Sequence, residues 1–239
     1  MIAYPGLAAL ADEPHPFPEH DVLNGLVAQD TNTDGPGRVR IVVDGVPDVL
    51  RFYGGAPEGC TKEPVIFLRG DVLRLQNDVL EVFPAYNRLG PHEQHLWARE
   101  TAVAFDRPFL HLARPGMCGS SGDHRDRRCE REVALVDRAL DKLKEAFGWR
   151  RLNLVGQSGG GHLVGALIAR RHDIDCAVIS SGNVAVRLRN QLAGWDRDIT
   201  GHSEFVDPID HVGQVAGHPP RKIIVLTDRR DQVVRCEVQ

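Results

Sequence analysis

Short apolar runs alternate with longer segments of helical spacing from about residue 36 onward. The apolar runs lie at 64–70, 108–113, 151–155, 176–180 and 222–227, and the helical segments at 92–104, 127–148 and 160–171. Nearly continuous apolar strands that alternate with helices are typical of a parallel sheet buried on both faces. The pattern therefore predicts an α/β protein with helices on both faces of a mostly parallel sheet.

A strand-turn-strand pattern precedes these elements. The segments RVRIVV (38–43) and VLRFYG (49–54) flank DGVPD, whose Asp-Gly pair at 44–45 is a typical hairpin turn. We therefore expect a leading β-hairpin that joins the sheet. Residues 1–35 lack this pattern and carry no basic segment ahead of an apolar one, so they are interpreted as a loose leader and not as a signal peptide. The predicted division is a leader at 1–35 and one domain at 36–239.

Two further segments lie between the predicted elements of the sheet. The charged run at 123–132 is interpreted as the solvated start of the helix that follows. Residues 182–220 are long for a connection between two strands, and a long loop beside a site is often a lid. Within this segment, 183–195 is expected to form one small helix. Trp195 and Phe205 are candidates to line a substrate pocket, with structural packing as an equal alternative.

Composition narrows the class of protein. The net charge is −4 and 42% of the residues are hydrophobic, which is ordinary for a globular protein and argues against a nucleic-acid binder. No apolar stretch is long enough to span a bilayer. Five scattered cysteines, none in a CxxC pair, disfavour a zinc or redox site and fit reduced thiols in a cytoplasmic protein. A Cys60–Cys118 disulfide stays open for an exported protein. No metal or cofactor is predicted.

The most informative short stretch is GQSGG at 156–160, between an apolar run and a helical segment. Here Gly156, Ser158 and Gly160 form a Gly-x-Ser-x-Gly pattern at a strand-to-helix turn. Such a turn presents a serine as a nucleophile at the carboxyl end of a parallel strand, and larger neighbours would clash in it. The alternative is an ordinary turn, because serine and glycine are common turn residues.

Four stretches together resemble the α/β-hydrolase superfamily, in particular its bacterial prolyl-oligopeptidase and esterase branch. They are RGD at 69–71, ARPGMCGSSGDH at 113–124, GQSGGG at 156–161, and FVDPIDHV at 205–212 followed by KIIVLTDRRDQVV at 222–234. The resemblance implies an acyl-enzyme mechanism with Ser158 as the nucleophile. It also implies that the backbone N–H groups of Gly159 and Asp71 form the oxyanion hole.

The resemblance further implies an acidic residue after the last predicted strand. Asp231 is the preferred candidate because DQVV fits the family pattern, and Asp228 is the competitor; an exposed loop aspartate without a role is the alternative. The general base should be a histidine downstream of the acid. Because the last histidine is His218, we expect that the final strand, helix and catalytic histidine are missing through truncation.

Of the remaining histidines, only His162 is a candidate base. His162, one turn along the helix from Ser158, could act as a base but is expected to be a packed residue. His124 could contact substrate, and His211 is given no role.

The sequence leaves two hypotheses for function. The first is a serine hydrolase that cleaves an ester or peptide bond of a small substrate, and the second is a truncated or degenerate non-catalytic protein of the same fold. Without a further strand, residues 222–227 would form an exposed sheet edge. This edge predicts a homodimer through residues 222–227, a poorly ordered segment, or aggregation.

Overall fold

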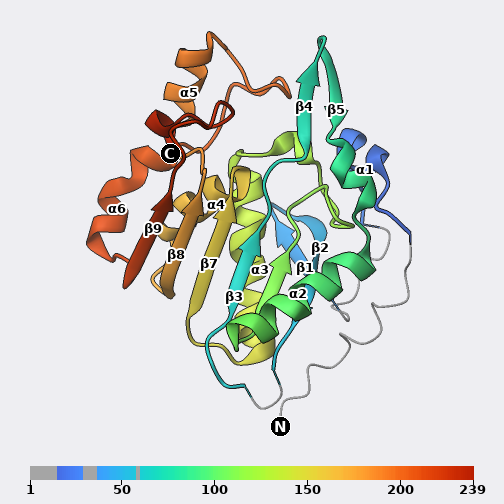
Figure 1. Ribbon diagram of the computed structural model, residues 1–239, viewed down its shortest axis with the longest axis vertical. Helices are drawn as coiled ribbons and strands as arrows, with labels where there is room; N and C mark the ends of the chain where they lie inside the picture. The colour runs from blue at the N-terminus through green and yellow to red at the C-terminus, as the bar shows by residue number, and fades with distance from the viewer. Residues whose placement is uncertain (1–14, 29–36, 58–59) are drawn as a thin grey trace.

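A seven-stranded sheet forms the centre of the molecule in the computed structural model, which describes residues 15–28, 37–57 and 60–239 (Figure 1). The strand order is β1-β2-β6-β3-β7-β8-β9. The bounds are β1 Arg38–Val43, β2 Val46–Gly55, β3 Val65–Leu68, β6 Phe109–Leu112, β7 Leu152–Gln157, β8 Ile174–Ser180 and β9 Lys222–Leu226. The five strands from β6 to β9 in this order are parallel, which confirms the predicted mostly parallel sheet.

The leading hairpin is present. Strands β1 and β2 pair antiparallel, with Val43 opposite Val46, and β2 then pairs antiparallel with β6. The turn residues Asp44 and Gly45 have φ values of 51° and 76°. Two successive positive φ values are what a two-residue hairpin turn requires, and Asp-Gly supplies them at low steric cost. Strand β2 begins at Val46, three residues earlier than predicted.

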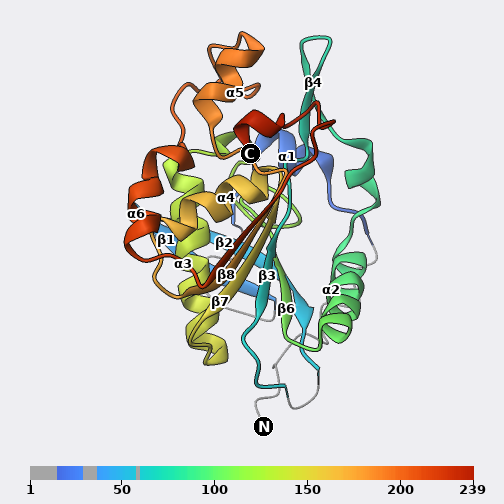
Figure 2. The ribbon, with the colours of Figure 1, turned by 60° about the vertical axis from the view of Figure 1, so that its left-hand side comes forward.

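Helices cover both faces of the sheet, as predicted. Helix α2 (Pro91–Phe105) lies on one face, and α3 (Glu130–Phe147) and α4 (Gly159–Ile168) lie on the other (Figure 2). The apolar stripe of α3 is fully buried at Val133, Val136, Leu140 and Leu143. These side chains pack with those of β3, β6 and β7 in the main hydrophobic core. This core anchors the strands whose carboxyl ends carry the candidate site described below.

Several elements were not predicted. Strands β4 (Leu73–Gln76) and β5 (Val79–Val82) form a separate two-stranded sheet. The remaining helices are α1 (Glu19–Asn24), α5 (Val186–Ala193) and α6 (Val212–Gly217), with short 3-10 helices at Pro84–Arg88, His124–Asp126, Pro208–His211 and Cys236–Val238. Helix α5 agrees with the small helix expected within 183–195. In Figure 1, α5 and the β4–β5 hairpin project beyond the carboxyl end of the parallel strands.

Part of the predicted leader packs onto the domain. Phe17 and Val22 are buried in a second hydrophobic cluster with Tyr53 and Tyr86. Leu26 forms a β-bridge with Gly122. Residues 15–28 are therefore not loose, whereas 1–14 and 29–35 of the predicted leader lie outside the described residues.

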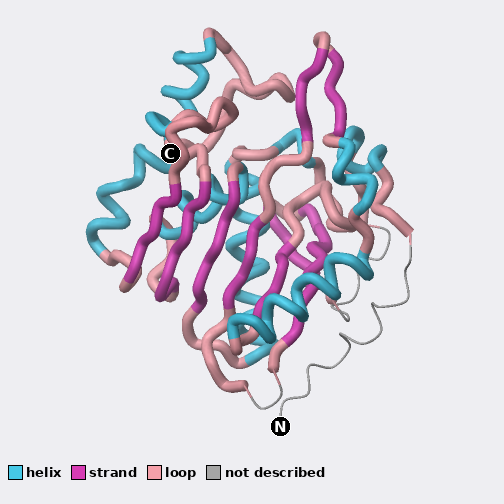
Figure 3. Tube along the Cα trace, in the orientation of Figure 1, coloured by secondary structure: helices cyan, strands magenta, loops and turns pink. Residues whose placement is uncertain are grey.

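Strand β9 is an edge of the sheet in the part of the chain that the structure describes (Figure 3). Its apolar side chains are unusually accessible, with Ile223 39%, Val225 47% and Leu226 52% exposed.

No described helix is long and apolar enough to cross a membrane. The five cysteines are free thiols, so the Cys60–Cys118 disulfide is not formed.

Candidate active site

Ser158 lies at a sharp turn between β7 and α4. Its φ and ψ are 54° and −117°, a positive-φ conformation that is strained for any residue with a side chain. The surrounding backbone fixes this turn, because Ser158 N donates to Ser180 O at 2.8 Å and His162 N donates to Ser158 O at 3.1 Å. A conformation of this kind raises the serine side chain above the end of the strand.

The neighbouring glycines are required by close backbone approach. A β-carbon on Gly156 would lie 2.2 Å from Gly160 O, and one on Gly160 would lie 2.0 Å from Leu68 O. Real β-carbons do not approach backbone atoms this closely, so a larger residue at either position would displace β3 or the start of α4. The Gly-x-Ser-x-Gly pattern therefore reflects packing of the turn against the next strand.

Ser158 is half-buried. Within the described ranges no side chain hydrogen-bonds to it. The turn thus presents the hydroxyl, but no group beside it is placed to accept its proton.

Asp71 follows β3 and lies against the turn. A β-carbon on Gly159 would lie 2.0 Å from Asp71 Oδ1, so the carboxylate occupies the space beside the first residue of α4. Arg114 donates to Asp71 Oδ1 at 2.8 Å, and Arg128 donates to Asp71 Oδ2. Burial alone would raise the pKa of Asp71, but the charges of Arg128 and neighbouring arginines hold that pKa well below its ordinary value.

A buried ion cluster extends from Asp71. Arg114 also pairs with Glu132 at 2.8 Å, and Arg127 and Arg128 pair with Asp198 at 2.7 and 2.5 Å. We call the six residues of this network the charge cluster: Asp71, Arg114, Arg127, Arg128, Glu132 and Asp198.

The charge cluster corrects the interpretation of 123–132 as a solvated helix start. Arg127, Arg128 and Glu132 are 2–4% exposed. Their partners Asp71 and Asp198 lie on distant loops, so the local charge pattern gave no sign of burial.

The two predicted oxyanion-hole residues lie together at the turn. Gly159 is the first residue of α4, where a helix leaves its N–H groups without partners. In the described part of the chain, neither Gly159 N nor Asp71 N donates a recorded hydrogen bond. Their proposed role in the oxyanion hole stays a prediction.

Asp231 lies in the loop after β9, and its carboxylate is held in place. Its Oδ1 accepts hydrogen bonds from Val233 N and Val234 N, both at 2.9 Å. Burial raises the pKa of Asp231, but the bonds from Val234, the Ser181 side chain and Val233 lower it below its ordinary value. The competitor Asp228 is instead 52% exposed and pairs with Arg230.

Ser158 and Asp231 lie at the same end of the sheet, after the carboxyl ends of parallel strands, but are not in direct contact. Ser158 follows β7, Ser181 follows β8, and Asp231 follows β9. Ser181 N donates to Leu226 O at 2.9 Å, which ties the ends of β8 and β9 together. No hydrogen bond joins Ser158 to Asp231 among the described residues, so a third group would have to connect them.

None of the considered histidines supplies that group. His162 is fully buried, its Nε2 lies 2.8 Å from Val206 O, and burial lowers its pKa to about 3. The structure therefore agrees with the packed interpretation of His162. His124 is also fully buried, beside the charge cluster, so it cannot contact a substrate from the surface. His211 lies on the 3-10 helix Pro208–His211, away from Ser158 in the chain and without a recorded bond to it.

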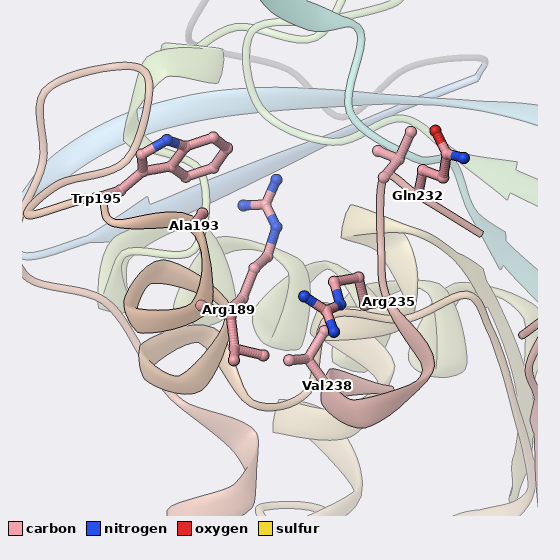
Figure 4. Close-up of a pocket in the computed structure, with 8 residues that line it drawn as sticks. Arg189, Ala193, Trp195, Gln232, Arg235 and Val238 are labelled. Atoms are coloured by element: carbon pink, nitrogen blue, oxygen red, sulfur yellow. The ribbon is translucent and has the colours of Figure 1, made fainter. Parts of the chain in front are cut away.

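A cavity of about 150 Å³ opens between α5 and the C-terminal residues (Figure 4). Its lining residues are Arg189, Leu192, Ala193, Trp195, Gln232, Val233, Arg235 and Val238. The predicted pocket residue Trp195 lines this cavity. Phe205 does not: it packs under the Arg187 guanidinium at 5.9 Å. Arg189 was missed by sequence reasoning, since nothing local distinguishes it from other surface arginines.

No protein-family model and no curated protein sequence matches the chain. Solved structures do. An esterase from Pyrococcus furiosus matches with a TM-score of 0.54 and 15% identity, over 84% of this chain and 72% of that one. Est1E from Butyrivibrio proteoclasticus with ferulic acid bound matches with a TM-score of 0.55 and 15% identity, over 83% and 82%. An acylaminoacyl peptidase from Pyrococcus horikoshii matches with 0.54 and 12%, over 84% and 33%. Together with the strand order, these likenesses show that the chain has the α/β-hydrolase fold.

Proposed function

We propose that the protein is a serine hydrolase that cleaves an ester or peptide bond through an acyl-enzyme on Ser158. The observation that carries the proposal is the positive-φ conformation of Ser158 at the carboxyl end of a parallel strand. Strain of this kind persists only where the surrounding structure enforces it, and it is typical of functional sites. That solved structures of the same fold include esterases and a peptidase supports the substrate class.

The oxyanion would be stabilised by the N–H groups of Gly159 and Asp71. One such donor is worth about 3–4 kcal/mol of transition-state stabilisation in other serine hydrolases. A carboxylate beside an oxyanion would normally oppose it. Here Arg114 and Arg128 neutralise Asp71 through short, buried ion pairs, which removes this objection.

Asp231 would orient the base and stabilise the positive charge that the base acquires when it takes the proton of Ser158. Two backbone hydrogen bonds, from Val233 N and Val234 N, hold its carboxylate, so its geometry does not depend on the base. The base itself would be an imidazole located between Asp231 and Ser158.

A second function follows from a different observation. No described histidine is hydrogen-bonded to Ser158 or Asp231. A protein that keeps the fold and the turn but has no base could serve as a non-catalytic binding scaffold.

A fluorophosphonate probe tests the nucleophile, because it phosphonylates only an activated serine. In the presence of imidazole, which supplies the proton acceptor that the described residues lack, we expect one label per chain on the wild-type protein and none on Ser158→Ala. Ser203→Ala is the matched control, since Ser203 is an exposed loop serine and its loss should leave labelling unchanged.

Added imidazole separates the two functions. If the turn and the acid are assembled and only the base is absent, free imidazole should accelerate hydrolysis of p-nitrophenyl acetate more with wild-type protein than with Ser158→Ala. Subtracting the Ser158→Ala rate removes catalysis by imidazole in solution. Folded protein that shows neither labelling nor a Ser158-dependent increment would support the binding scaffold instead.

A further inference from the structure

Arg189 on α5 differs from the arginines of the charge cluster. Arg114, Arg127 and Arg128 each pair with at least one carboxylate of that cluster. In the described part of the chain, the Arg189 guanidinium has no ion pair and no hydrogen bond.

The charges near Arg189 do not offset it. The charge cluster holds three acids and three arginines, so its acids are already matched. Arg189 lies close enough to interact electrostatically with both Asp198 and Asp71, and it adds one positive charge to this region. Burial and Arg128 lower the pKa of Arg189 to about 10, which leaves it charged at neutral pH.

The guanidinium points into the cavity described above. Figure 4 shows the Arg189 side chain between Trp195 and Gln232. The Arg189 guanidinium carbon lies 4.9 Å from the centre of the Trp195 ring, a cation–π distance that fixes its orientation. The other walls are mainly apolar, from Leu192, Ala193, Val233 and Val238. The two polar side chains that complete the lining are Gln232 and Arg235, and Arg235 already pairs with Glu237 at 3.0 Å.

The cavity opens beside the proposed acid. Gln232 and Val233 follow Asp231 directly, and Val233 N is one of the donors that hold the Asp231 carboxylate. A group in the cavity would therefore lie at the same carboxyl end of the parallel strands as Ser158 and Asp231. A cavity of about 150 Å³ is the size that accommodates a benzene molecule in a protein interior.

We propose that this cavity binds a compact apolar group of the substrate that bears a carboxylate, with Arg189 as the specificity-determining partner of that carboxylate. Apolar walls would hold the body of the group, and the forked guanidinium would pair with its two oxygens. The inference rests on the proposed hydrolase function for its biological meaning, but the binding itself requires no catalysis.

Binding of benzoate and of its neutral analogue benzamide tests the proposal. Both are titrated into the Ser158→Ala protein and followed by ligand NMR, so hydrolysis plays no part. We expect benzoate to bind at least about tenfold more tightly than benzamide, and Arg189→Gln to remove that difference. Arg187→Gln is the matched control on the same helix, because Arg187 is half-exposed and already pairs with Asp207; it should preserve the preference.

Equal affinity for benzoate and benzamide in the parent protein would overturn the proposal, and this comparison does not depend on whether Arg189→Gln folds. An unchanged preference in folded Arg189→Gln would overturn it as well. Selective benzoate binding without fluorophosphonate labelling would sustain the subsite while refuting the hydrolase. Labelling without selectivity would do the reverse.

Discussion

The carboxylate of Asp71 occupies the space into which a side chain on Gly159 would project, with Asp71 Oδ1 only 2.0 Å from the position of such a β-carbon. This relationship joins the turn that carries the nucleophile to the charge cluster behind it. Because Asp71 is held by buried arginines, it cannot swing aside without breaking ion pairs.

Gly159→Ala should therefore destabilise the fold and disturb the turn. Overpacking of this kind costs about 1–3 kcal/mol, and fluorophosphonate labelling of Ser158 should fall in parallel. Gly213→Ala is the control: Gly213 lies in α6 with nothing near its β-carbon position, so alanine there should leave stability unchanged or raise it. Urea unfolding measures both, and equal effects would contradict the packing argument.

Arg114→Met should be far more costly than loss of a surface ion pair. Arg114 is fully buried and pairs with both Asp71 and Glu132, so its removal leaves the buried Glu132 without an ion-pair partner and Asp71 with one arginine fewer. The expected loss is about 3–5 kcal/mol of unfolding free energy. Arg170→Met, which breaks a partly exposed pair with Glu130, should cost about 0–1 kcal/mol. A small loss for Arg114→Met would show that the cluster contributes little.

His111 should make the protein less stable in acid. It is fully buried on β6 against Phe67 and Trp97, and burial followed by the charge of Arg69 lowers its pKa to about 3. The unfolded chain binds a proton that the native protein excludes, so this contribution is complete above pH 6.5 and is lost as the pH falls toward 3. His111→Phe should flatten the pH dependence of unfolding free energy by about 1.4 kcal/mol per pH unit in that range. Parallel curves for variant and wild type would refute the assignment.

Asp231→Asn and Asp228→Asn separate the two candidate acids. Asparagine at 231 can still accept the N–H bonds of Val233 and Val234, so the loop should keep its shape. We expect Asp231→Asn to lower the imidazole-dependent hydrolysis by at least about tenfold, because the carboxylate no longer stabilises the imidazolium. Asp228→Asn should retain the wild-type rate. The opposite ranking would transfer the acidic role to Asp228.

Dimerisation through residues 222–227 stays a prediction. Among the described residues no strand pairs with the outer side of β9, where Val225 is exposed, and such an edge is a template for pairing with a second copy. We propose a dimer that Val225→Lys dissociates, as measured by size-exclusion chromatography with light scattering. Val212→Lys, exposed on α6 and off the edge, should leave the dimer intact. A stable wild-type monomer would end the proposal.

The sequence predicts the features whose causes are local. The parallel strands follow from apolar runs such as VIFL at 65–68, the hairpin follows from Asp44-Gly45, and the turn at Ser158 follows from its glycines. Strands β4 and β5 escape detection because they include polar residues and are partly exposed, unlike the equally short but mostly buried β3 and β6.

The charge cluster and Arg189 could not be predicted, because their character comes from tertiary contacts. Arg127 and Asp198 are 71 positions apart, and each looks solvent-exposed in its own surroundings. Arg189 is distinguished only by the absence of a partner in the described structure and by the Trp195 ring beside it.

Adjacent Arg127 and Arg128 both pair with Asp71 on one side and with Asp198 on the other. This dipeptide therefore links Asp71, which lies against the nucleophile turn, to Asp198 in the loop after α5. Leu192, Ala193 and Trp195 line the cavity and take no part in these ion pairs. The residues of the cavity wall can therefore be substituted one by one without changing the ion pairs that support the turn at Ser158. This part of the molecule is for that reason a suitable starting point for redesigning selectivity.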